Sequence, residues 1–114
     1  MKLSEIQKEI HETAVSKGWW EDDQTRSFGD ITALFHSEIS EAYEEYRNHK
    51  GITEIWYSGE GENKKPEGIP VELADCIIRI LDYSEKMGIN MEDVIRTKLA
   101  YNKTRSHRHG NKKA

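Results

Sequence analysis

Apolar residues recur along this chain at intervals of three and four residues, which is the spacing of one face of an α-helix. Near the N-terminus the recurring positions are Leu3, Ile6, Ile10 and Ala14. They predict a first helix. Ser4 is suited to the N-cap of that helix, and Gly18 is typical of a residue that ends one.

A second helix is expected to begin between Ser27 and Asp30 and to run to about Lys50. Its apolar face consists of Ile31, Leu34, Phe35, Ala42 and Tyr46. Residues 51–69 contain the letters SGEGENKKPEG, and this abundance of glycine, charge and turn-forming residues predicts a mobile loop. Within it, ITEIWY permits either an extension of the helix or a short strand, and the sequence does not decide between them.

Pro70 suits the first turn of a third helix, and Gly88 suits its end. The apolar face of this helix consists of Ala74, Ile77, Ile78 and Leu81. Asn90 is expected to cap a fourth helix with Asp93 in its first turn, and that helix frays into a basic tail at about 103–114. The whole pattern predicts one all-α domain over residues 1–114, a bundle of four to five helices.

The composition fits a small domain that folds without disulfides. A chain of 114 residues buries roughly two thirds of its unfolded surface. Its one cysteine, Cys76, stands in an apolar run and is expected to be a small buried hydrophobe in a reducing compartment. No stretch reaches the ~18 apolar residues of a membrane helix. The first letters, MKLSEIQKEIHETA, carry acidic residues where a signal peptide is apolar, so we expect a cytoplasmic protein without a membrane partner.

Charge is distributed unevenly along the chain. From Val94 onward there are seven Lys or Arg residues and no Asp or Glu, whereas the preceding part carries a net charge of −11. An acidic body with a basic end suits a ligand that interacts with charges of both signs, such as a metal-bound polyphosphate. A solvated basic tail is the other interpretation of the same pattern.

Two pairs of acidic residues repeat one spacing. Glu38 and Glu41 stand three residues apart in the second predicted helix, and Glu72 and Asp75 do so in the third. Residues at this spacing are about 60° apart around a helix, so each pair projects together. If the two helices pack antiparallel, four carboxylates converge and repel each other unless a cation neutralises them. Glu45 continues the row of Glu41.

The acidic rows border apolar rows, which is also typical of an ordinary amphipathic helix. If the rows do hold a metal, oxygen ligands suit Mg²⁺, with Mn²⁺ as a possible substitute. Iron is disfavoured, because helical di-iron proteins use Glu-x-x-His pairs and no Glu in this chain has a His three residues later.

The motifs EISE and ELAD, taken in this order, resemble the Glu-x-x-Glu and Glu-x-x-Asp signature of the all-α nucleoside triphosphate pyrophosphohydrolases. The resemblance is to the MazG-like branch, especially its small phage and bacterial forms. KPEGIPVELADCIIRILDY is similar to the third-helix block of that branch, and KLAYNKTRSHRHGNK to its closing Lys-x-x-x-Asn-x-x-Arg segment. The similarity runs from about Phe28 to Lys112.

This resemblance implies Mg²⁺-dependent cleavage of a nucleoside triphosphate between its α and β phosphates, which yields a monophosphate and pyrophosphate. It implies four metal ligands, Glu38, Glu41, Glu72 and Asp75. Lys98, Asn102 and Arg105 correspond to positions that contact the polyphosphate. Glu45 or one of the four ligands orients the attacking water. Relatives are homodimers or homotetramers with active sites near subunit interfaces, and the same is expected of this chain.

Two further expectations concern the tryptophans and the basic tail. Trp20 and Trp56 are candidates for stacking on the base, with packing in a core or interface as the alternative for each. A different class of function is a non-enzymatic helical adaptor that binds nucleic acid through its basic C-terminal tail. The carboxylate pattern disfavours nucleic acid as a partner, because carboxylates repel phosphate when no metal is bound.

Overall fold

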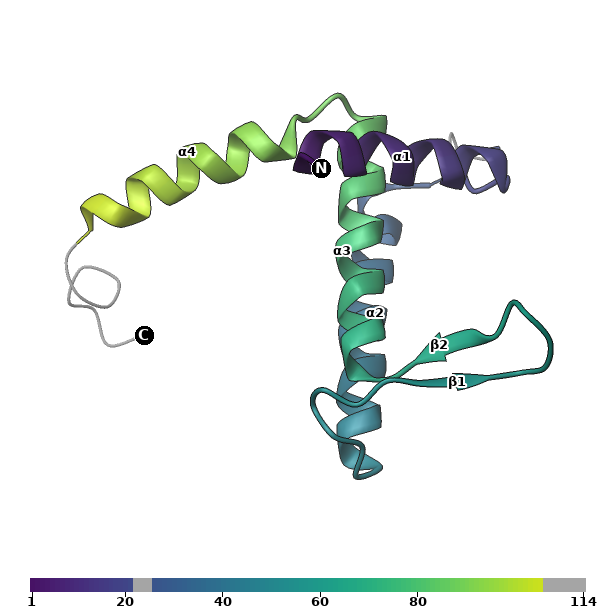
Figure 1. Ribbon diagram of the computed structural model, residues 1–114. Coiled ribbons are helices and arrows are strands. Elements are labelled where there is room, and N and C mark those ends of the chain that lie inside the picture. Colours follow the sequence, from purple (N-terminus) through teal and green to yellow (C-terminus); the bar gives the residue numbers. More distant parts are fainter. Residues whose placement is uncertain (22–25, 106–114) are drawn as a thin grey trace.

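The computed structural model describes residues 1–21 and 26–105. Within these residues the chain is mostly helical, as predicted, and one small antiparallel sheet interrupts the helices (Figure 1). In chain order the elements are α1 (Leu3–Ser16), α2 (Phe28–Arg47), β1 (Trp56–Ser58), β2 (Lys65–Glu67), α3 (Ile69–Lys86) and α4 (Met91–Thr104). No helix among the described residues has both the length and the apolar character needed to cross a bilayer.

The helices α2 and α3 form an antiparallel pair, as the convergence of the acidic rows requires. α1 crosses this pair at the end where α3 finishes, and the β-hairpin extends from the opposite end (Figure 1). α4 leaves the top of α3 and projects away from the other helices. Within the described residues, the four helices of one chain therefore do not close into the predicted bundle.

Local capping interactions set most of the helix ends at the predicted places. Ser27 and Asp30 form a reciprocal capping box at the start of α2, and Asn90 accepts a hydrogen bond from the Asp93 N–H at the start of α4. Gly88 follows α3 with φ 74°, the left-handed conformation that glycine adopts without strain.

Two predicted helix ends were wrong by a few residues. α1 begins at Leu3 with Lys2 as its N-cap, and the Ser4 N–H instead donates to Glu92 at 3.1 Å. α2 ends at Arg47 rather than near Lys50, because His49 adopts φ 66° and so leaves the helix.

The predicted loop over residues 51–69 contains a β-hairpin. The loop prediction is therefore wrong for the strand residues, Trp56–Ser58 and Lys65–Glu67. Trp56, Tyr57 and Ser58 pair with Glu67, Pro66 and Lys65. The strand alternative for ITEIWY therefore holds for Trp56 and Tyr57. The glycine-rich letters between the strands form the turn region, and the mobility of this segment stays a prediction.

The core lies between α2 and α3 and between α1 and α3. Its buried apolar side chains are Ile31, Ala42, Ile69, Cys76 and Leu81. Cys76 is a free buried thiol, as expected. The predicted apolar face of α3 is only partly correct, because Ala74, Ile77 and Ile78 are exposed and Ile77 reaches 57%. α3 is apolar on several sides, so spacing alone does not identify the side that α2 covers.

One flank of the α2–α3 pair remains apolar and exposed. On α2 the exposed row consists of Ile39, Tyr43 and Tyr46, and on α3 it begins with Leu73 and Ile77. α4 has no buried residue, although Val94, Ile95, Leu99 and Tyr101 are large and apolar. A single chain therefore leaves two apolar surfaces in contact with solvent.

Candidate functional site

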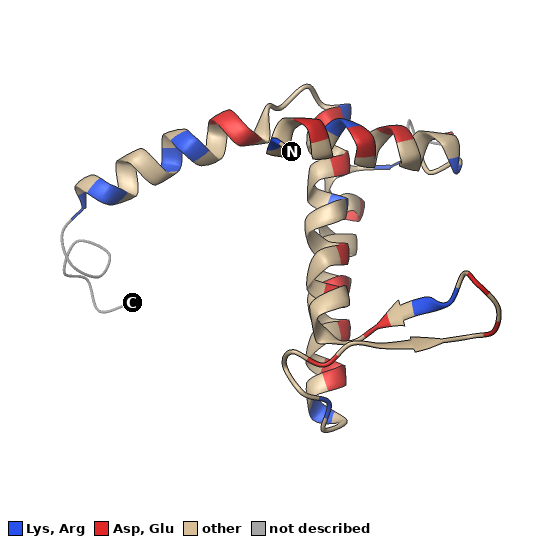
Figure 2. Cartoon of the chain, viewed as in Figure 1, with Lys and Arg blue, Asp and Glu red and all other residues tan. Residues whose placement is uncertain are grey.

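Three carboxylates, one from α2 and two from α3, converge in the described structure. Oxygen atoms of Glu38, Glu72 and Asp75 all lie within 4.8 Å of one another. Figure 2 shows the acidic residues on the side of the α2–α3 pair from which the hairpin extends. The antiparallel packing thus brings together one member of the first acidic pair and both members of the second.

Glu72 occupies the first turn of α3, and its Oε2 atom is buried without a hydrogen-bond partner in the described structure. Burial, and next to it the neighbouring Glu41 carboxylate, raise the pKa of Glu72 from 4.5 to about 7. A buried carboxylate oxygen with no partner is costly. A proton or a cation supplied at this position offsets that cost.

Arg79 neutralises part of the cluster. Its Nε–H donates to Oε1 of Glu38 at 2.5 Å, and the Glu38 side chain is 6% exposed. Burial and the Glu38 charge raise the pKa of Asp75, while Arg79 and Lys65 act in the opposite direction. The guanidinium therefore balances one carboxylate and leaves the negative charge of the others.

Glu41 and Glu45 lie along the same side of α2 but outside the group of three within 4.8 Å. Glu41 is exposed and affects Glu72 through the contact just described. Glu45 is half-buried one turn further along. Glu44 is exposed on another side of α2 and pairs with Arg47 at 3.2 Å, as expected for a solvated residue.

A pocket of about 230 Å³ adjoins the carboxylates between α1, α2 and α3. Its apolar wall consists of Ile10, Ala14, Ile78 and Trp19. Its polar wall consists of Glu38, Asp75, Arg79 and Asp82. Trp19 is 44% exposed, and the Arg79 guanidinium carbon lies 5.0 Å from its ring centre. The pocket therefore combines a flat aromatic surface with charged groups of both signs.

The two tryptophans predicted to stack on a base lie elsewhere. The Trp20 indole N–H donates to both carboxylate oxygens of Asp82, at 3.0 and 3.1 Å, and Asp82 also contacts His11 at 2.7 Å. Trp56 lies on β1, where the Lys50 ammonium is 4.8 Å from its ring centre. Neither ring lines the 230 Å³ pocket, and base binding by either stays a prediction.

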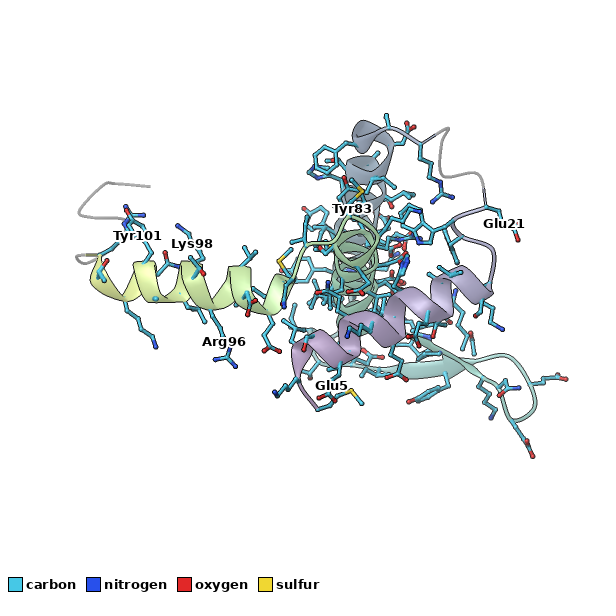
Figure 3. The ribbon with its side chains drawn as sticks, turned by 90° about the horizontal axis from the view of Figure 1, so that it is seen from above. Glu5, Glu21, Tyr83, Arg96, Lys98 and Tyr101 are labelled. Atoms are coloured by element: carbon cyan, nitrogen blue, oxygen red, sulfur yellow. The ribbon has the colours of Figure 1, made fainter. Side chains whose placement is uncertain are left out.

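The predicted phosphate-contacting residues lie on α4 and at its C-terminal end, away from the carboxylates of the same chain. Lys98 and Asn102 lie on one side of α4, and Arg105 directly follows the helix as its C-cap. Figure 3 shows Lys98 and Tyr101 on the projecting helix. The remainder of the predicted basic tail, residues 106–114, lies outside the described residues.

Sequence reasoning missed Arg79 and Trp19 as parts of the site. Arg79 stands four residues after Asp75 and seven after Glu72, so its position on the acidic row was visible. Its pairing with Glu38 depends on how α2 and α3 pack. Nothing in the adjacent letters of Trp19 and Trp20 indicates which ring faces the pocket.

Comparison with protein-family models, with curated proteins and with solved structures finds no match to this chain. The roles of the site residues therefore rest on their chemistry and geometry and on the resemblance carried by the two acidic motifs.

Proposed function

We propose that this protein is a Mg²⁺-dependent nucleoside triphosphate pyrophosphohydrolase, which cleaves a nucleotide between its α and β phosphates. The observation that carries the proposal is the convergence of Glu38, Glu72 and Asp75 around the unpartnered buried oxygen of Glu72. The order and spacing of the motifs EISE and ELAD support the same reaction class.

The donor set fits a hard divalent cation. Every donor in the cluster is a carboxylate oxygen, the type of ligand that Mg²⁺ and Mn²⁺ prefer. Glu38, Glu72 and Asp75 are the ligands in this proposal, and Glu41 is near enough to Glu72 to join them. When bound, Mg²⁺ supplies charge neutralisation at the phosphate oxygens.

The side chains around the cluster have complementary roles in this proposal. Carboxylates that are not needed as ligands, with Glu45 among the candidates, accept a proton from the attacking water. Arg79 donates hydrogen bonds to a phosphate oxygen, because guanidinium groups bind phosphate as readily as carboxylate. Cationic side chains stabilise the charge that develops on the pyrophosphate leaving group.

The base is proposed to stack on Trp19. Pockets for drug-sized ligands span about 300–1,000 Å³. The pocket beside Trp19, about 230 Å³, therefore suits one part of a nucleotide. A base against the apolar wall leaves the sugar and phosphates directed to Glu38 and Asp75, which line the other side. Stacking on an aromatic ring contributes about 1–3 kcal/mol per base.

The active form is proposed to be a homo-oligomer in which α4 of one copy covers the α2–α3 pair of another. Lys98 and Asn102 are flanked by apolar residues on both sides, namely Ile95, Leu99, Val94 and Tyr101. Burying this face against a second copy removes apolar surface from water. It also carries Lys98 and Arg105 to a partner, where phosphate-binding groups are needed.

A nucleotide panel tests the proposed reaction. The protein is incubated with Mg²⁺ and with canonical and modified ribo- and deoxyribonucleoside triphosphates, and the products are identified by chromatography. We expect a monophosphate and pyrophosphate, lost in Asp75→Asn and retained in Glu44→Gln. Glu44 is the matched control, because it is an exposed carboxylate on α2 outside the cluster.

Other products contradict the proposal in distinct ways. Release of orthophosphate means that a different bond is cleaved. Absence of turnover with every nucleotide, together with salt-sensitive binding of DNA or RNA, supports the adaptor function instead.

The pKa of Glu72 predicts how stability depends on pH when no metal is bound. Between the unfolded value of 4.5 and the folded value of about 7, the folded protein holds a proton that the unfolded chain has released. The stability that this proton contributes is complete below pH 4.5 and is lost as the pH rises through about 7. In EDTA we expect Tm to fall between about pH 5 and 8, with a smaller fall in Glu72→Gln.

Added Mg²⁺ is expected to raise Tm most at the alkaline end of this range, because the cation competes with protons for the carboxylates. Thermal unfolding with EDTA or Mg²⁺ at several pH values measures both effects. Identical pH profiles for the wild type and Glu72→Gln would show that Glu72 does not titrate in this range.

A further inference from the structure

The two faces of the β-hairpin differ in burial. In an antiparallel pair, residues directly opposite each other lie on the same face, and alternate residues along each strand share that face. One face thus carries Trp56, Ser58, Lys65 and Glu67, and the other carries Tyr57 and Pro66. Trp56, Ser58 and Glu67 are half-buried, whereas Lys65, Tyr57 and Pro66 are exposed. We call the first face the inner face, because three of its four residues are half-buried.

The inner face carries a cation on the strand that packs against α3. The Lys65 ammonium lies 3.8 Å from Oε1 of Glu67, the last residue of β2. Figure 2 shows the basic start of β2 on the same side of the α2–α3 pair as the acidic rows. β2, which begins with Lys65, therefore leads directly into the helix that carries Glu72 and Asp75, on the side where these two residues would hold a cation.

The connection between the hairpin and α3 is short and closely packed. β2 ends at Glu67 and α3 begins at Ile69, with Gly68 between them at φ 130°. A Cβ atom at Gly68 would lie 2.3 Å from the carbonyl oxygen of Glu54, so the two backbone segments are in direct contact. This contact fixes the hairpin relative to the first turn of α3, and with it Lys65 relative to Glu72.

Stability does not explain the position of Lys65. Its side chain is 76% exposed, and an exposed pair at 3.8 Å contributes little to folding. Lys65 is held loosely by one carboxylate, and the nearby cluster would bind a cation. Such a lysine is suited to binding an anionic group of a ligand. Phosphate is a strong competitor for such a lysine, because its oxygens form charge-assisted hydrogen bonds with an ammonium group.

We propose that Lys65 is a substrate-binding residue that contacts the polyphosphate of the nucleotide, in exchange for its contact with Glu67. This inference rests on the proposed function, since it assigns a phosphate contact to the same site. The hairpin then forms the wall of the site opposite α1, and its contribution comes from the same chain as the carboxylates.

Binding of magnesium pyrophosphate by the full-length protein tests the inference by calorimetry, without turnover. Lys65→Gln is expected to weaken this binding about tenfold or more. Lys64→Gln is the matched control, because it removes the same charge from the exposed residue just before β2, and should change the affinity less than twofold. Glu67→Gln should strengthen the binding, since it releases Lys65 from its competitor.

Binding of Mg²⁺ alone separates a phosphate contact from a structural role. Removing the positive charge of Lys65 should leave Mg²⁺ affinity unchanged or higher. Weaker Mg²⁺ binding in Lys65→Gln would overturn the inference, as would equal pyrophosphate affinities in Lys65→Gln and Lys64→Gln.

Failure of this inference is distinguishable from failure of the proposed function. If the wild type hydrolyses nucleotides and the two lysine variants behave alike, only the role of Lys65 is wrong. If the wild type binds magnesium pyrophosphate through Lys65 but hydrolyses no nucleotide, the phosphate contact stands and the reaction is wrong. A wild type that neither binds magnesium pyrophosphate nor hydrolyses a nucleotide overturns both.

Discussion

Replacing Glu72 by glutamine is expected to abolish nucleotide hydrolysis and, at the same time, to stabilise the protein when no metal is bound. Activity should fall by at least about 10²-fold, because a bound cation supplies several kcal/mol of transition-state stabilisation and Glu72 is one of its proposed ligands. Stability should rise at pH 8, because the buried Oε2 of Glu72 has no partner and its charge is repelled by Glu41 and Asp75. A gain of roughly 1 kcal/mol corresponds to about 4–8 °C in Tm.

Enzyme assays and thermal unfolding in EDTA, both at pH 8, measure the two effects. Glu44→Gln is the control, since it should change neither activity nor Tm appreciably. A loss of activity together with a gain of stability identifies a carboxylate that serves the reaction and destabilises the fold. A Glu72→Gln protein that loses stability together with activity would indicate a structural role and contradict the metal-ligand assignment.

Placing a charge on the apolar face of α4 is expected to dissociate the oligomer and to remove activity. Leu99 is half exposed in the single chain, and burial of a leucine contributes about 1.5–3 kcal/mol. Leu99→Lys should therefore give a monomer by light scattering and lower activity by at least about 10²-fold. Thr97→Lys adds the same charge on another side of α4 and should preserve both properties. A fully active Leu99→Lys monomer would show that a single chain suffices.

Mixing two inactive variants tests whether α4 serves the partner's carboxylates. One variant carries Asp75→Asn, and the other carries Lys98→Ala with Arg105→Ala. In a mixed dimer with exchanged α4 helices, one site combines wild-type carboxylates with a wild-type α4. For a dimer with free subunit exchange, the mixture should then recover about a quarter of the wild-type activity. If the mixture stays inactive although mixed oligomers form, each α4 serves the carboxylates of its own chain. If the Lys98→Ala, Arg105→Ala variant is active by itself, these two residues have no role in the reaction.

The sequence predicted those features that depend on neighbouring residues. Asn90 was identified as a cap because its side chain can accept a hydrogen bond from the backbone N–H three residues away, as it does from Asp93. Gly88 was identified as a helix end because it tolerates a left-handed backbone. The acidic pairs were found because a helix brings residues three apart to one side, whatever the helix packs against.

Features that depend on distant residues were not predictable from the letters alone. The hairpin joins Trp56 to Glu67 across a glycine-rich turn region, and no local signal sets that register. Ile77 has the spacing of a core residue, but α2 covers a neighbouring side of α3 and leaves Ile77 exposed. The projection of α4 was hidden for the same reason, because an apolar face indicates burial without indicating which chain provides the cover.

The sequence by itself determined a mostly helical chain and two acidic pairs, since helix periodicity and capping act over three to seven residues. The tertiary structure decided which carboxylates meet, with Glu38, Glu72 and Asp75 in one group and Glu41 beside it. It also decided that Arg79 pairs with Glu38 and that Lys65 pairs with Glu67. These outcomes depend on the packing of α2 against α3 and on the anchoring of the hairpin, which join segments tens of residues apart.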